Sequence, residues 1–245
     1  MHPIEVHEEV RRLAAQGLRD GEIAQRTGLA RTTVRDIRAP RASQSARELC
    51  HRCWRRTTAV RWDAGDYAEL LGLYLGDGCI SRLARTYSFR LSLDARYPGI
   101  LADARALMDR VFSGNSVARC PVRGTGAVVL TVYSSHAPCV FPQHGPGKKH
   151  LRPIVLEAWQ DDLVQAAPWR FLRGCIRSDG CVFINRTGPY EYLSYEFSNK
   201  SDDIRSLFVR TCRAVGLEPR PAGTSVRIYR RASVALLQEH VGIKA

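Results

Sequence analysis

Two stretches of the sequence, 102 residues apart, decide the fold. Residues 70–80 read Leu-Leu-Gly-Leu-Tyr-Leu-Gly-Asp-Gly-Cys-Ile, and residues 172–182 read Leu-Arg-Gly-Cys-Ile-Arg-Ser-Asp-Gly-Cys-Val. Several residues of the first stretch recur in the second at the same offset: Leu70, Gly72, Asp77, Gly78 and Cys79. An internal repeat over this distance indicates two structurally similar halves.

Segments of the same type follow each stretch in the same order. After the first come a strand at 89–93, an amphipathic helix at 99–113, a strand at 128–133 and a helix around 151–160. After the second come a strand at 195–198, a helix at 202–215, a strand at 225–229 and a helix at 231–240. The pattern predicts an α+β domain over residues 66–245, built from two pseudo-symmetric αββαββα repeats at about 66–160 and 168–245.

Small residues four positions apart mark one face of each repeated stretch. Gly72 and Gly76 in the first are matched by Gly174 and Ser178 in the second. Such positions share a face of a helix, and small side chains there allow two helix backbones to approach closely. We therefore predict that the two stretches are helices that pack against each other along a pseudo-twofold seam.

Both predicted helices end in Asp-Gly, at Asp77 and Asp179. An aspartate is electrostatically unfavourable at a helix C-terminus, which already carries partial negative charge. Two aspartates side by side at the seam would also repel each other. A divalent cation between them removes both penalties, and Mg²⁺ suits such a site because it uses one or two carboxylates and keeps several waters.

The two stretches resemble the paired motif helices of the LAGLIDADG homing endonucleases, and the resemblance covers about 180 of the 245 residues. It implies a saddle of two antiparallel sheets that binds double-stranded DNA. It also implies that Asp77 and Asp179 hold Mg²⁺ and activate water for phosphodiester cleavage on both strands. The adjacent backbone of Gly76 and Ser178 is a further candidate for metal ligation.

Basic side chains near the acid pair assist catalysis in that family. The longest acid-free stretch, residues 110–156, contains Lys148 and Lys149, and Lys200 follows the strand predicted at 195–198. These three lysines are therefore candidate catalytic residues, with a purely electrostatic role as the alternative.

The chain departs from the family pattern inside the motifs. The sixth motif position, which is often acidic, is Leu75 in the first copy and Arg177 in the second, and Cys175 replaces a more usual aliphatic residue. The essential acids remain, although Arg177 is expected to alter the seam. The alternative reading of Asp77 and Asp179 is that they cap helices in a fold retained for binding alone.

DNA contacts are expected on the faces of the predicted sheets. Arg227 and Tyr229 alternate with Val226 and Ile228, which is the pattern of a strand with one apolar and one polar face. Basic and tyrosine side chains on the other strands or their turns are candidates of the same kind, although each could be an ordinary surface residue: Arg82, Arg85, Arg90, Arg119, Arg123, Arg186, Tyr190, Tyr192 and Tyr195.

Residues 1–40 are predicted to form a separate all-α domain. Apolar residues recur at helical spacing through residues 4–38, with a glycine turn at Gly28. The pattern resembles the helix-turn-helix of DNA-binding regulators, with an ordinary three-helix bundle as the alternative. The resemblance implies a recognition helix that faces bases or phosphates with five side chains: Arg31, Thr32, Thr33, Arg35 and Arg38.

Residues 41–65 read as a basic linker that contains Cys50-His51-Arg52-Cys53. Cys50 and Cys53 could supply half of a Zn²⁺ site, but a structural zinc site needs two more ligands and no second pair follows at a suitable spacing. Plain thiols or a degenerate zinc ribbon are the alternatives.

The composition of the chain indicates the chemical class of its partner and its cellular compartment. The formal net charge of +13 points to a polyanionic partner, most often nucleic acid. No apolar run approaches 18 residues, the N-terminus does not read as a secretory signal, and the eight cysteines read as reduced thiols. We expect a cytoplasmic, nucleoid-associated protein without a membrane partner, monomeric through its two-repeat core.

Two functions remain open from the sequence. The first is a Mg²⁺-dependent, site-specific double-strand DNA endonuclease of the homing type, which the acid pair favours. The second is a DNA-binding transcriptional regulator that uses the same fold without cleavage, which the N-terminal module favours.

Overall fold

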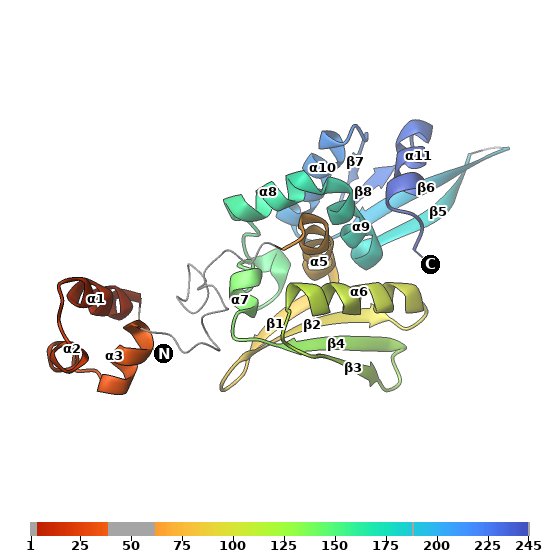
Figure 1. The fold of residues 1–245 in the computed structure, drawn as a ribbon. Coiled ribbons are helices and arrows are strands. Elements are labelled where there is room, and N and C mark those ends of the chain that lie inside the picture. The colour runs from red at the N-terminus through yellow and green to blue at the C-terminus, as the bar shows by residue number, and fades with distance from the viewer. Residues whose placement is uncertain (1–3, 39–61, 188, 245) are drawn as a thin grey trace. The chain divides into compact units, whose positions relative to one another are not determined.

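The computed structural model describes residues 4–38, 62–187 and 189–244, and the chain divides into two compact units at Trp62 (Figure 1). Cys50 and Cys53, with the predicted zinc half-site, lie outside the described residues. Among the described residues, no helix has the length and apolar character needed to cross a membrane.

In residues 4–38 the chain forms the helices α1 (Ile4–Ala15), α2 (Asp20–Thr27) and α3 (Arg31–Arg38). One small core joins them, made of Val10, Leu13, Ile23, Val34 and Ile37. Gly28 ends α2 with a φ of +67°, a conformation that glycine adopts without strain. The helices and the glycine turn expected from the sequence are confirmed.

The described part of the second unit is an α+β domain of two similar halves, as predicted. The first half contains α5 (Ala64–Asp77), β1 (Gly78–Arg82), β2 (Tyr87–Asp94), α6 (Pro98–Val111), β3 (Val117–Val122), β4 (Ala127–Tyr133) and α7 (Ala137–Val140). A 3₁₀ turn, η1 (Lys149–Leu151), and α8 (Ala158–Ala166) lead to the second half. That half contains α9 (Pro168–Asp179), β5 (Gly180–Thr187), β6 (Tyr190–Ser198), α10 (Asp202–Ala214), β7 (Arg220–Ala222), β8 (Ser225–Ile228) and α11 (Arg231–His240).

Each half builds one antiparallel sheet of four strands, in the orders β1-β2-β4-β3 and β5-β6-β8-β7. The two sheets lie on either side of the α5–α9 pair, and α6 and α10 cover one face of their respective sheets (Figure 1). A single apolar core runs through both halves. The second unit is therefore built from two similar halves that share the α5–α9 seam.

The prediction of a helix around 151–160 is wrong. The short helix α7 closes the first repeat at the place that α11 occupies in the second, and α8 begins only at Ala158. The intervening backbone bonds to other segments: the Ile154 N–H donates to Asp203 of α10 at 2.8 Å, and Gln143 Nε2 donates to the Val155 carbonyl at 2.8 Å. These tertiary bonds replace the helical ones that the sequence pattern suggested.

The seam between α5 and α9 is as close as the small residues predict. A Cβ added to Gly72 would lie 2.6 Å from the carbonyl oxygen of Phe171, and one added to Gly76 would meet the Ser178 side chain. No larger residue fits at either position without separating the helices.

Charged side chains bridge the same seam beside the glycines. The buried Glu69 of α5 pairs with Arg170 at 2.6 Å and Arg177 at 2.8 Å, both on α9. Arg177 also pairs with Asp103 of α6 at 2.8 Å. Arg177, which differs from the motif of the homing endonucleases, therefore forms an ion pair with the buried Glu69 and links α9 to α5 and α6.

Candidate functional site

Asp77 and Asp179 occupy the last positions of α5 and α9, where the seam brings the two helix ends together. A Cβ on Gly76 would lie 3.1 Å from Cγ of Asp179, so the second acid lies against the residue that precedes the first. The Asp179 carboxylate repels that of Asp77.

Burial shifts the pKa values of both acids and of a neighbouring lysine in the direction that disfavours their charged forms. Burial, with repulsion from Asp179, raises the pKa of Asp77 to about 6. Burial also raises the pKa of Asp179, opposed by a hydrogen bond of 2.6 Å from Asn199 Nδ2. Burial lowers the pKa of Lys149 to about 8, although both aspartates oppose this shift. Desolvated acids and a lysine thus meet at one place, as at many functional sites.

Two lysines cap the ends of the paired helices. The ammonium of Lys149 donates to the carbonyls of Leu75 at 2.8 Å and Gly76 at 3.0 Å, and also to that of Tyr74. The ammonium of Lys244 donates to the carbonyl of Ser178 at 2.7 Å. Each lysine satisfies carbonyl groups at a helix C-terminus and offsets its negative partial charge.

Lys244 was missed by the sequence reasoning, although one signal was present. Lys149 follows the last helix of the first repeat, α7, and Lys244 follows the last helix of the second, α11. The carbonyls of Gly76 and Ser178, expected as backbone ligands of a metal, already accept hydrogen bonds from these lysines. A carbonyl oxygen has two lone pairs, so metal ligation by this backbone stays a prediction.

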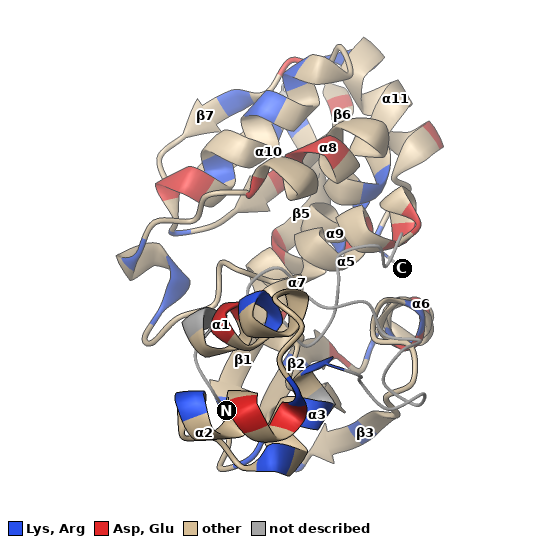
Figure 2. Cartoon of the chain, turned by 60° about the vertical axis from the view of Figure 1, so that its left-hand side comes forward, with Lys and Arg blue, Asp and Glu red and all other residues tan. Residues whose placement is uncertain are grey.

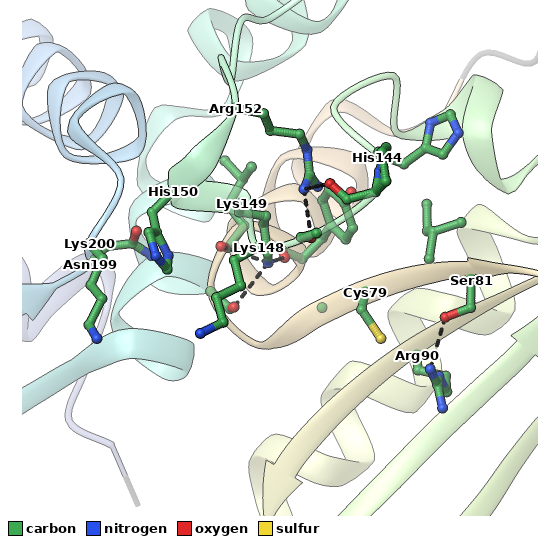
Figure 3. A pocket seen from close by; sticks show the side chains of 18 of the residues that line it. Cys79, Ser81, Arg90, His144, Lys148, Lys149, His150, Arg152, Asn199 and Lys200 are labelled. Atoms are coloured by element: carbon green, nitrogen blue, oxygen red, sulfur yellow. Dashed lines mark hydrogen bonds between the residues drawn. The ribbon is translucent and has the colours of Figure 1, made fainter.

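Two hollows flank the acid pair. The Asp179 hollow, of about 1110 Å³, is lined among others by Lys148, Lys149, Arg152, Asn199 and Lys200. Lys148 and Lys149 extend from the loop before α8, and Asn199 and Lys200 lie across from them after β6 (Figure 3). The three lysines expected near the acids thus line one hollow.

The Asp77 hollow, of about 620 Å³, lies on the other side of the pair. Its lining includes Asp77, Asp94, Arg96, Tyr97 and Lys244. Lys244 Nζ lies 5.5 Å from the centre of the Tyr97 ring, a cation–π distance that joins the end of the second repeat to the first.

The acid pair suits a hard divalent cation. Within the described residues, no group of three or more His, Cys, Asp or Glu side chains could hold a metal ion. The protein ligands of a cation would therefore be the two aspartates. Mg²⁺ is commonly held by one or two carboxylates with waters and substrate phosphates completing its shell. The residues present fit that coordination.

The strand register sorts the predicted DNA contacts between the two faces of each sheet. Side chains alternate between the two faces along a strand, and directly paired residues share a face. Arg90 and Glu196 each stand between two buried residues of their strands, so they and their partners lie on the face away from the core. We call this exposed side the outer face. Arg90 pairs with Thr131, Glu196 with Arg227, and Asn185 with Tyr192, which places Arg90, Arg227 and Tyr192 on the outer face.

Further residues extend the outer face or its rim. Arg220 pairs with Arg227 on the outer face and was not predicted. Tyr190 and Tyr229 are exposed, as predicted. Arg85 and Arg123 are exposed in the turns β1–β2 and β3–β4.

Other predicted contacts lie on the opposite side. Arg82 pairs with Tyr87, Arg119 with Leu130, and Arg186 with Glu191, which puts these three arginines on the side of the sheet that carries the core. All three are exposed, and Arg82 lines the Asp179 hollow, so their contact with DNA stays a prediction. The expectation for Tyr195 is wrong: its ring is fully buried, and its hydroxyl donates to the Gly242 carbonyl at 3.0 Å.

The helix-bearing side of the second unit does not concentrate positive charge. Figure 2 shows acidic residues on α8 and residues of both signs on α10, and Arg210 of α10 pairs with Asp161 of α8. In the N-terminal unit, Arg31, Thr32, Arg35 and Arg38 are exposed on α3, Thr33 is half-buried, and Arg38 pairs with Asp20. Exposed cations are therefore available on α3 and around the acid pair.

No protein-family model matches this chain, and no curated protein matches it in sequence. Solved structures are similar to it at low identity. Full-length DUF199/WhiA from Thermatoga maritima is 15% identical with a TM-score of 0.48; the match covers 74% of this chain and 56% of that chain, little more than half of its length. I-DmoI in complex with DNA and Mn is 15% identical with a TM-score of 0.47, over 73% of this chain and 97% of that chain. I-WcaI bound to its DNA recognition sequence is 13% identical with a TM-score of 0.45, over 74% and 83%.

Proposed function

We propose that this chain is a DNA-binding protein whose acid pair is the centre of a divalent-metal-dependent endonuclease of the LAGLIDADG type. One observation carries the proposal: the seam holds Asp77 and Asp179 together at the junction of the two sheets, with lysines around them. A phosphodiester is the substrate that such a combination of carboxylates and cations would serve.

The residues of the site would divide the work. Asp77 and Asp179 would hold Mg²⁺, which when bound lowers the pKa of a coordinated water and offsets the charge that develops on the phosphate. Lys149 and Lys244 keep the helix ends in place and reduce the repulsion between the acids. The exposed Lys200, with Lys148, is positioned to reach a phosphate oxygen.

The outer faces would contact the duplex. Arg90, Arg220 and Arg227 supply cations for phosphates, and Tyr192 and Tyr229 supply flat side chains that both bury area and form hydrogen bonds. The helix α3, with Arg31, Thr32, Thr33, Arg35 and Arg38, would read a second segment of DNA as a recognition helix.

Because both repeats lie in one chain, we propose that the protein acts as a monomer. Its excess of basic residues and its DNA partner favour a place in the nucleoid.

A second function is supported by the lysine caps. Lys149 and Lys244 place two positive charges beside the two aspartates, so the site is close to neutral without any metal. A site of this kind could persist in a DNA-binding regulator that has lost cleavage.

Incubation with a pool of random duplexes separates the two functions. The endonuclease cuts a subset of the pool with Mg²⁺, and cutting is lost in the Asp77→Asn/Asp179→Asn double variant. Sequence-selective protection without cutting, unchanged by EDTA and by the double variant, supports the regulator instead. Absence of both cutting and protection refutes DNA binding itself.

A further inference from the structure

The β5–β6 hairpin is longer than its counterpart, β1–β2, in the first repeat. The two hairpins can be aligned because each begins with the glycine that follows the motif aspartate. Counted from there, the last pair of the first hairpin, Arg82 with Tyr87, corresponds to Ile184 with Leu193 in the second. The second hairpin continues with further pairs, whose residues we call the extension: Asn185 with Tyr192, Arg186 with Glu191, and Thr187 with Tyr190. In Figure 1 the extension is the end of the hairpin that reaches beyond β7 and β8.

Aromatic rings lie on the outer face of the extension. Glu196 is on the outer face and side chains alternate along β6, so Tyr192 and Tyr190 share that face. Phe183 joins them from the paired strand β5. The rings of Tyr190 and Tyr192 have centroids 6.1 Å apart, and these residues are 62% and 46% exposed. The first hairpin carries Ser81 at the position of Phe183, so this ring patch (Phe183, Tyr190 and Tyr192) breaks the repeat.

The extension offers no net charge to the phosphates of an intact duplex. Its charged side chains, Arg186 and Glu191, pair with each other at 2.8 Å on the opposite face. The cations of the outer face lie closer to the start of the hairpin, where Arg227 pairs with Glu196 and Arg220 pairs with Arg227. An intact duplex exposes phosphates and base edges, while the faces of its bases are stacked on one another. Exposed rings without cations therefore fit the faces of unpaired bases better than they fit a duplex.

We propose that the ring patch is a stacking platform for unpaired bases, so that the protein binds DNA most tightly where a duplex opens into a single strand. Arg220 and Arg227 would hold phosphates of the adjoining duplex. The formal net charge of +13, and the continuity of the patch with the face that carries these arginines, favour a nucleic acid over a protein as the occupant. This inference rests on the proposed function for its partner and deepens it by naming the form of DNA.

Binding to paired and unpaired DNA tests the inference without any cleavage. Fluorescence anisotropy of a labelled duplex is measured with the full chain in EDTA, once with blunt ends and once with a single-stranded thymidine tail. Thymidine serves because every base has a face that can stack, and a free oligothymidylate is the third probe. We expect the tail to tighten binding by at least about tenfold, because each base stacked on a ring adds to the affinity.

Substitutions in the ring patch separate stacking from other contacts. Tyr190→Ala/Tyr192→Ala should remove most of the gain from the tail, while the slope of log K against log salt stays unchanged because stacking releases no counterions. Tyr190→Phe/Tyr192→Phe keeps the rings and should keep the gain. Tyr133→Ala is the matched control and should also keep it, because Tyr133 is 54% exposed but pairs with Ser88 on the outer face of the first sheet. Circular dichroism of each variant shows whether the fold is retained.

The outcomes separate this inference from the proposed function. Equal binding of the tailed and blunt duplexes overturns the inference and leaves the proposed function intact, as does a gain that the alanine pair retains or the phenylalanine pair loses. Binding of the oligothymidylate without binding of the blunt duplex supports the ring patch and refutes the duplex partner of the proposed function. A wild-type chain that self-associates, and that becomes monomeric in the alanine pair with its DNA binding unchanged, makes the patch a protein interface and overturns the inference.

Discussion

Replacement of Gly72 by alanine tests the close seam on which the acid pair depends. The added methyl group would lie 2.6 Å from the carbonyl oxygen of Phe171 and 2.8 Å from the backbone nitrogen of Cys175. A relaxed contact needs roughly 3.5 Å, so the helices must separate by about 1 Å. Because the obstructing atoms belong to a helix backbone, they cannot move aside as a side chain would.

The free-energy change follows from two opposing effects. Overpacking costs about 1–3 kcal/mol, and the rigid obstruction places Gly72→Ala at the upper end. Alanine recovers roughly 1 kcal/mol of helix propensity. We therefore expect a net loss of about 2 kcal/mol in the free energy of unfolding of the second unit.

Urea unfolding of the full chain, followed by tryptophan fluorescence, measures this loss. Trp62 and Trp159 pack near Tyr67 in the core of the second unit and report its unfolding. Gly65→Ala is the matched control in the same helix, because its methyl group would meet only the side chains of Asp63 and Arg170, at 3.1 and 3.3 Å. A Gly72→Ala protein as stable as the control would mean that the seam tolerates a methyl group at this position.

Substitutions at three other positions have definite expected outcomes. Arg177→Glu places a third acid beside Glu69 and Asp103 and should cost about 3–5 kcal/mol in urea unfolding, whereas Arg177→Met should cost less. Lys244→Met removes the cap of α9 and should lower stability by about 1 kcal/mol in a thermal melt; an unchanged melting temperature would contradict the cap. The Arg110 guanidinium lowers the pKa of Asp66, so Asp66 stabilises the fold above its unfolded pKa and this contribution disappears as pH falls through the folded value. Asp66→Asn should therefore cost about 1 kcal/mol at pH 7, and this cost should shrink as the pH falls through the folded pKa of Asp66; a cost that does not change with pH would contradict the ion pair.

The repeat and the seam could be predicted because their signals are local. The constant offset between Asp77 and Asp179 and the four-residue spacing of Gly72 and Gly76 determine which helices pair and which faces meet. The glycine turn at Gly28 is equally local, since only its own backbone conformation is involved.

Features that depend on partners distant in sequence could not be predicted. Residues 153–157 follow an apolar pattern, but their backbone bonds to Asp203 and Gln143 instead of forming a helix. Tyr195 reads as an outward residue until the strand register places it beside Phe197 in the core.

The site shows the same division. Lys148, Lys149 and Lys200 were found because positive charge stands out in an acid-free stretch or next to a predicted strand. Lys244 was missed because it sits near the end of the chain, with no motif around it, and reaches Ser178 only through the fold.

In the proposed function, the paired helices deliver the acid pair to a divalent cation at the DNA backbone. Anomalous diffraction from crystals of the full chain with a selected duplex and Mn²⁺ tests it most directly. We expect an anomalous peak within coordination distance of an Asp77 carboxylate oxygen, between the helix ends and a phosphate. A duplex bound across both sheets with no anomalous peak near Asp77 or Asp179 would contradict it.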